Sequence, residues 1–127
     1  MADAADEKIR QLTAPMLRKK LYVVLSKPTG TPEQIKACTP SHLEFMIGLE
    51  KKGILFASGP FLGPDGKPTG DGMTILRTAS AEEAKRIAET DPFFVGGLRR
   101  FEVREWMLME GSLGLTVRFS DQSVALA

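Results

Sequence analysis

The sequence contains one cysteine, Cys38, and one histidine, His42. A single cysteine cannot form a disulfide within the chain, which favours a reducing, cytoplasmic location. A metal site built from several histidines and cysteines is also ruled out by this scarcity, so we expect no metal. We expect no other cofactor. A haem- or flavin-linked monooxygenase stays open as an alternative, but the sequence has no ligand motif for such a group beyond His42.

An excess of charge of one sign is also missing, as is a long apolar segment. Seventeen Lys and Arg against sixteen Asp and Glu give a net charge of +1, whereas nucleic-acid binding requires a clear excess of positive charge on one face. No apolar run approaches the roughly 20 residues of a membrane helix. The acidic, Ala-rich start is unlike a secretory leader. We expect no nucleic-acid partner and no membrane association.

What is present is the composition of an ordinary globular domain. The chain has 127 residues, of which 43% are hydrophobic and 26% charged, and this length suits one domain. The first 19 residues are polar and Ala-rich and are expected to form an extension with a helix over residues 6–13. We place the domain at residues 20–108. A C-terminal extension follows at 109–127, with a possible strand over 113–119 and then a polar tail.

The pattern of apolar residues predicts four strands in the domain, over residues 21–25, 54–57, 73–76 and 101–106. A capping box at residues 31–34 opens a short helix that Pro40 is expected to interrupt. Thr39 then caps a longer helix ending at Gly53. A third helix begins at the capping box of residues 80–83 and ends near Thr90. The glycine-rich segment 59–72 is expected to be a long turn.

The resulting order, β-α-β-β-α-β, is that of an α+β, ferredoxin-like fold. Both helices then cover one face of an antiparallel sheet. The first strand is apolar at successive positions rather than alternating, which predicts that its second face is covered as well. We favour a homodimer in which a second subunit covers this face of the sheet. The alternative is that the N-terminal helix or the C-terminal strand folds over this face.

His42 and Asp91 are the first candidates for chemistry. His42 is predicted in the first turn of the long helix, and Asp91 directly follows the last one. In the predicted topology the helices run antiparallel, so the two residues can meet at one end of the sheet. A carboxylate that accepts one ring N–H of a histidine leaves the other nitrogen free to accept a proton. Such a pair can also be purely structural, capping a helix and closing the edge of the core.

Several motifs in order resemble the YCII-related (YciI-like) family over about residues 21–107. They are His42-Leu43, Lys52-Gly53-Ile54-Leu55, Ser58-Gly59-Pro60-Phe61, Asp65-Gly66-Lys67-Pro68-Thr69-Gly70, Asp91-Pro92-Phe93 and Val103-Arg104-Glu105-Trp106. The resemblance implies a subunit that pairs as a dimeric α/β barrel, with an active site centred on His42 and Asp91. Some family members are tied to the breakdown of aromatic compounds, including dehydrochlorination of hydroxylated rings, and the fold resembles that of muconolactone isomerase.

The candidate substrate-binding residues flank this pair in the family motifs: Ser58, Gly59, Pro60, Phe61, Pro92 and Phe93. The Ser58 hydroxyl could donate to a substrate oxygen or satisfy the backbone at a strand end. The phenylalanines could line an apolar pocket for a ring or belong to the core. Arg99 and Arg100 could hold a substrate carboxylate, but before an edge strand such charges more often discourage aggregation.

These observations predict a small cofactor-free enzyme, a lyase or isomerase. It would catalyse proton transfer, by isomerisation or by an elimination such as dehydrochlorination, on a small cyclic or aromatic oxygenated metabolite. His42 would be the general base or acid and Asp91 would orient it. The alternative is a non-catalytic small-molecule-binding or accessory protein with the same pocket. An RNA-recognition module is set aside, because the third strand carries no aromatic residue to stack on bases.

Overall fold

The computed structural model describes residues 3–127, which form two compact units. The first, here the core unit, is Lys20–Met107. The second, the terminal unit, combines the described residues up to Lys19 with Leu108–Ala127. None of the helices described is long and apolar enough to cross a membrane.

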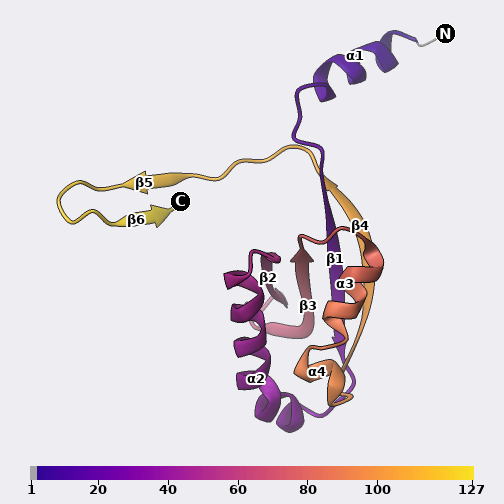
Figure 1. The fold of residues 1–127 in the computed structure, drawn as a ribbon, viewed down its shortest axis with the longest axis vertical. Helices are drawn as coiled ribbons and strands as arrows, with labels where there is room; N and C mark the ends of the chain where they lie inside the picture. Colours follow the sequence, from indigo (N-terminus) through magenta and orange to yellow (C-terminus); the bar gives the residue numbers. More distant parts are fainter. Residues whose placement is uncertain (1–2) are drawn as a thin grey trace. The chain divides into compact units, whose positions relative to one another are not determined.

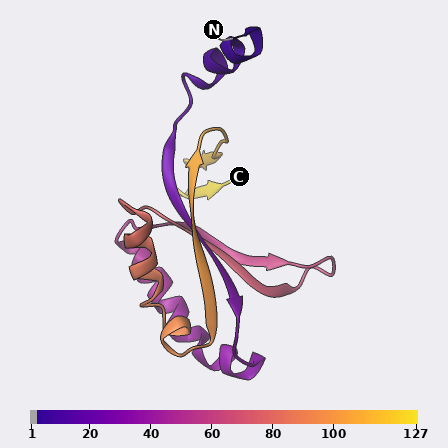
Figure 2. The ribbon, with the colours of Figure 1, turned by 90° about the vertical axis from the view of Figure 1, so that its right-hand side faces the viewer.

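The core unit is a four-stranded antiparallel sheet with helices on one face, the predicted α+β, ferredoxin-like arrangement (Figures 1 and 2). The strand order is β2-β3-β1-β4. The elements are β1 (Lys19–Pro28), α2 (Pro32–Lys51), β2 (Leu55–Leu62), β3 (Pro68–Leu76), α3 (Ala81–Ala88), α4 (Pro92–Val95) and β4 (Arg99–Leu108).

The hydrophobic core lies between the sheet and the helices. Tyr22 and Val24 of β1 point to this side and are buried with Met46 and Leu49 of α2. Val23 and Leu25 alternate onto the opposite face and are only half-buried. The first strand therefore packs one face on the helices. On the other face, which no helix covers (Figure 2), Leu21 and Ile75 are buried, whereas Val23 and Leu25 keep part of their surface exposed.

The expected break at Pro40 was wrong. Residues Pro32–Lys51 form one continuous helix, α2, with Pro40 inside it. The capping box of Thr31 and Gln34 is present at its start, as predicted. Proline lacks the N–H that would bond one turn back, but its fixed φ is helical, so a helix already stabilised by tertiary packing can continue through it. The expected cap at Thr39 was therefore wrong as well, since Thr39 lies inside α2 and its hydroxyl donates to the Ile35 carbonyl one turn earlier. His42 consequently lies in the middle of α2 rather than in a first turn.

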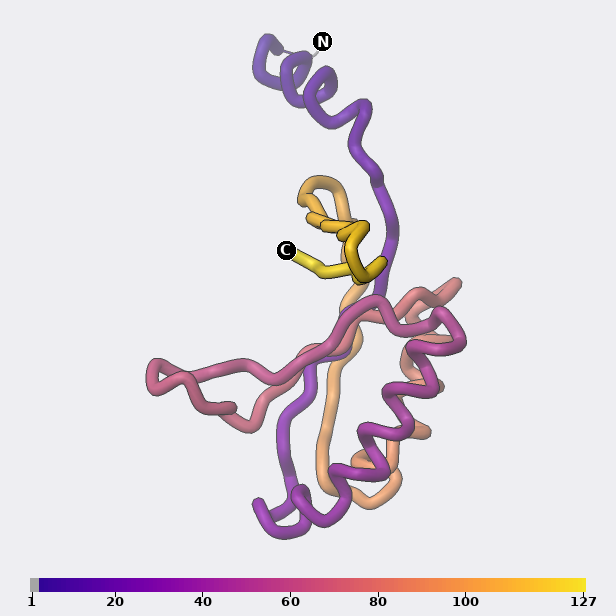
Figure 3. Tube along the Cα trace, turned by 90° about the vertical axis from the view of Figure 1, so that its left-hand side faces the viewer, coloured from indigo at the N-terminus to yellow at the C-terminus, as the bar shows by residue number. Residues whose placement is uncertain are grey.

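The long turn expected over residues 59–72 was also wrong, because most of this segment is strand. β2 runs to Leu62 and β3 starts at Pro68, and the connecting turn is closed by a hydrogen bond from the Gly63 N–H to the Lys67 carbonyl. Ser58 pairs with Thr74 and Pro60 with Gly72 across the hairpin. The hairpin curves away from the helices (Figures 2 and 3). Its glycines thus permit bending within strands as well as a turn.

In the terminal unit, helix α1 (Ala4–Thr13) covers the predicted 6–13 and is capped by Asp3. The strand expected over 113–119 is present in a shorter form as β5 (Leu115–Val117). It pairs with β6 (Val124–Leu126), where only a polar tail was expected. The pairing satisfies backbone groups that a tail would leave to water.

Candidate functional site

His42 and Asp91 meet at the site through two different helices. The Nδ1 atom of His42, on α2, lies 2.8 Å from Oδ2 and 3.0 Å from Oδ1 of Asp91. Asp91 is the N-cap residue of α4, the short helix that follows α3. The side chains of His42 and Asp91 are 23% and 19% exposed, so they are shielded but remain accessible to a small molecule.

The local sequence around Asp91 fixes its carboxylate. Pro92 occupies the first position of α4, where its missing N–H costs nothing. The Phe93 N–H donates to Asp91 Oδ1 at 2.9 Å. The carboxylate thus accepts hydrogen bonds from both the Phe93 N–H and the His42 ring, which restricts its rotation. The Asp-Pro pair, which follows the end of α3, thus starts the next helix.

The ring of His42 is held on its face as well as at its edge. It stacks on the ring of Phe93, with centroids 4.3 Å apart and planes 25° apart. Donation of the Nδ1 hydrogen to a carboxylate leaves a lone pair on Nε2. Within residues 3–127, no protein group hydrogen-bonds to Nε2. This nitrogen is therefore available to a ligand.

A cavity of about 600 Å³ adjoins the pair, a size within the range of pockets for small organic ligands. Four of the six predicted substrate-binding residues contribute to its wall, namely Ser58, Gly59, Pro60 and Phe93. Much of the remaining wall is apolar and is contributed by Val24, Ile35, Leu43, Met46, Phe94 and Phe101. The strands of the β2–β3 hairpin therefore bring the Ser-Gly-Pro segment to the histidine.

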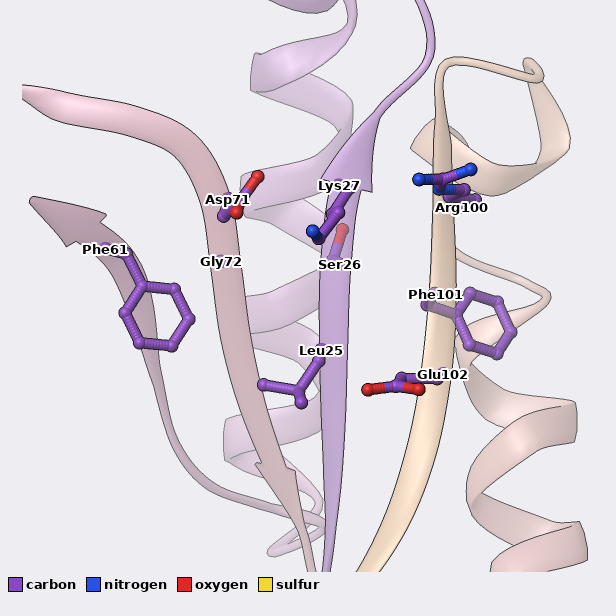
Figure 4. Close-up of a pocket in the computed structure, with 9 residues that line it drawn as sticks. All are labelled: Leu25, Ser26, Lys27, Phe61, Asp71, Gly72, Arg100, Phe101 and Glu102. Atoms are coloured by element: carbon purple, nitrogen blue, oxygen red, sulfur yellow. The ribbon is translucent and has the colours of Figure 1, made fainter.

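The other two predicted residues, Phe61 and Pro92, are not part of this wall. Phe61 follows Pro60 on the strand and lines a second depression with Leu25, Lys27, Arg100 and Glu102 (Figure 4). This depression shares Ser26, Asp71, Gly72 and Phe101 with the cavity. Successive residues of a strand point to opposite faces, so Pro60 and Phe61 serve different surfaces. Pro92 acts at the start of α4.

Arg99 lines the cavity, whereas the sequence favoured a role at the sheet edge over contact with a substrate carboxylate. Its guanidinium donates from Nε to Ser26 Oγ at 2.6 Å and from Nη2 to the carbonyls of Ser26 and Gly70 at 3.2 and 2.6 Å. The available signal was alternation along β4, since Phe101 and Val103 pack on the core and Arg99 shares their face. Arg100 points the other way and is exposed.

The model of the YCII-related domain matches residues 20–107. The chain belongs to the YCII-related family. One solved structure similar to this chain is the 5-chloro-2-hydroxyhydroquinone dehydrochlorinase TftG of Burkholderia phenoliruptrix AC1100, in complex with 2,5-dihydroxybenzoquinone. Sequence identity is 26% and the TM-score is 0.57, over 68% of this chain and 92% of that one. No protein with curated function matches the chain significantly.

Proposed function

We propose that this YCII-family protein is an enzyme that transfers a proton on a small cyclic, oxygenated substrate, with His42 as general base or acid. The observation that carries the proposal is the hydrogen bond between His42 and Asp91 at the wall of a cavity of about 600 Å³. A histidine oriented by a carboxylate, with its second nitrogen facing a ligand space, is the arrangement that general acid–base catalysis requires.

In this proposal Asp91 holds the Nδ1–H tautomer and stabilises the imidazolium that forms when Nε2 accepts a proton. The stack on Phe93 limits rotation of the ring. In an elimination, His42 takes the proton, the electron pair of the broken bond to hydrogen stays on the substrate and forms a double bond, and chloride leaves with the electron pair of its own bond. In an isomerisation, His42 returns the proton to another atom of the same substrate. Neither step needs a metal or an organic cofactor.

The proposed substrate class rests on the apolar wall and on the family. Flat apolar surfaces such as those of Phe93, Phe94 and Phe101 favour a ring over a flexible chain. TftG is a dehydrochlorinase of a chlorinated hydroxyhydroquinone, which supports a hydroxylated or halogenated ring here. We assign the Ser58 hydroxyl the role of a hydrogen-bond donor to an oxygen on the ring. Gly59 and Pro60 would contact the substrate as part of the cavity wall.

We further propose that two copies pair through the uncovered face of the sheet as a dimeric α/β barrel. Val23 and Leu25 are only half-buried there, although both are aliphatic. Phe61 is exposed and lines the same depression as Leu25, with β3 between them (Figure 4). Removing these side chains from water would stabilise a dimer, since buried apolar area contributes about 25 cal/mol per Å².

The test is a screen of hydroxyquinones, lactones and halogenated phenols against wild-type protein and His42→Ala. We expect turnover by the wild type and a loss of about 10²- to 10⁴-fold for His42→Ala. Glu44→Ala is the matched control, because Glu44 lies on the same helix, is exposed and does not line the cavity. If His42→Ala weakens binding while the wild type turns over none of these compounds, the alternative of a non-catalytic binding protein replaces the proposal.

A further inference from the structure

Arg99 carries a positive charge into the wall of the cavity without a carboxylate partner. Within the part of the chain that the structure describes, no Asp or Glu forms an ion pair with Arg99. A cation shielded from water is normally paired, because leaving it unpaired is costly. Arg99 therefore differs from an exposed arginine at a sheet edge, which water solvates.

The protein fixes the guanidinium but leaves part of it free. Three hydrogen bonds engage Nε and Nη2, to Ser26 and Gly70. The group also lies over the ring of Phe93, 5.6 Å from its centroid. The two N–H groups of Nη1 donate to no protein acceptor within residues 3–127. A positioned guanidinium with free donors is suited to an anionic oxygen.

The nearby carboxylates do not replace such an anion. Burial lowers the pKa of Arg99, and the charges of Asp71 and Asp91 partly oppose this effect. Asp91 already accepts hydrogen bonds from His42 and from the Phe93 N–H. Asp71 lines the cavity as well but does not reach ion-pair distance from Arg99. A bound anion would compensate the guanidinium for the hydration that it has lost.

We propose that Arg99 binds an ionised oxygen of the substrate and selects ring anions over neutral rings of similar size. This inference rests on the proposed function, because it assigns the substrate of the same cavity an acidic enol, phenol or carboxyl group. Arg99 and His42 both line that cavity and both contact Phe93. Arg99 would hold the charged oxygen while His42 exchanges the proton.

The test compares two probes by isothermal titration at neutral pH: 2,5-dihydroxybenzoquinone, which is ionised, and resorcinol, which is neutral. We expect Arg99→Gln to weaken binding of the ionised probe by roughly 10- to 100-fold, the range for a hydrogen bond to a charged group. Resorcinol binding is expected to change less than about threefold. Arg100→Gln is the matched control, because this neighbouring arginine is exposed and lines a different depression. It should leave the affinity for both probes unchanged.

Thermal unfolding of each variant shows whether it is folded. If Arg99→Gln does not fold, Arg99→Lys provides the test, since lysine keeps the charge but loses the planar pair of donors. It should give a smaller loss, again confined to the ionised probe. An equal loss for both probes, no loss, or a wild type that binds neither probe overturns the inference. If the selection holds but His42→Ala leaves turnover intact, the proposed function fails and the inference about Arg99 stands.

Discussion

His42 and Phe93 lie in a stack, with ring centroids 4.3 Å apart, and the two residues come from different helices. Phe93 is also the residue whose N–H donates to Asp91. The start of α4 thus holds the imidazole of His42 by two contacts. The phenyl ring of Phe93 stacks on its face, and the carboxylate of Asp91 accepts its Nδ1 hydrogen. The orientation of the imidazole depends on α4 being folded.

The first prediction separates the chemical and structural roles of Asp91. Asp91→Asn retains an oxygen that can cap α4, whereas Asp91→Ala removes the cap. We expect Asp91→Asn to lower turnover in the same direction as His42→Ala, within about 10²- to 10⁴-fold, with little change in stability. Asp91→Ala should lose turnover and also about 1 kcal/mol of unfolding free energy. Steady-state kinetics and urea titrations measure the two effects, and full turnover in Asp91→Asn would contradict the orienting role.

The second prediction concerns coupling. If His42 and Asp91 act as one unit, the double variant His42→Ala with Asp91→Asn should lose much less rate than the product of the two single losses. The pH dependence of turnover should also flatten in each variant. Independent, multiplicative losses would show that Asp91 acts on the substrate or the fold rather than through the histidine.

The third prediction uses two neighbouring valines of β1 that face opposite sides of the sheet. Val24 is buried against the helices, while Val23 lies on the uncovered face. Val24→Lys should prevent folding, because it buries an unpaired charge. Val23→Lys should fold and shift the protein from dimer to monomer. Analytical ultracentrifugation at micromolar concentration measures the masses, and a wild type of monomer mass would refute the proposed dimer.

The fourth prediction compares two glycines of the β2–β3 hairpin, both with positive φ. Gly66 has φ +77° and open space where a Cβ would lie, so Gly66→Ala should cost about 1 kcal/mol from backbone conformation alone. Gly70 has φ +101°, and a Cβ there would lie 3.3 Å from Pro28 Cγ. Gly70→Ala should therefore lower the free energy of unfolding by more than Gly66→Ala does. It should also weaken binding of 2,5-dihydroxybenzoquinone, because the Gly70 carbonyl holds Arg99. Equal stability and affinity of the two variants would argue against this role.

Local patterns were sufficient for the strand order and for the contact between His42 and Asp91. The capping residues Thr31 and Ser80 gave the helix starts, and the β-α-β-β-α-β order gave the antiparallel helices that bring the pair together. Catalysis by the pair stays a prediction, because a hydrogen bond alone does not distinguish it from a structural contact.

The wrong predictions of a helix break at Pro40 and of a long turn over residues 59–72 have a common cause, which is tertiary packing. Proline disfavours a helix interior, yet α2 continues through Pro40 because Met46 and Leu49 further along are buried against the sheet. Glycines favour turns, yet Gly72 is paired within β3, because Ser26 and Pro60 of the neighbouring strands lie opposite it. The role predicted for Arg99 rested on its charge alone. The alternation of side chains along β4 instead places Arg99 on the same face as Phe101 and Val103, where it lines the cavity.

Asp91 both caps α4 and accepts a hydrogen bond from His42, and this affects how the Asp-Pro-Phe motif can be used to find related proteins. Its carboxylate starts α4 whether or not any substrate is present. A related chain that had lost its chemistry would still gain stability from an aspartate here, so an Asp-Pro-Phe sequence by itself identifies a helix start. A search for active relatives needs the histidine from α2, 49 residues earlier, because without its hydrogen bond to this carboxylate the site has no proton acceptor of the proposed kind.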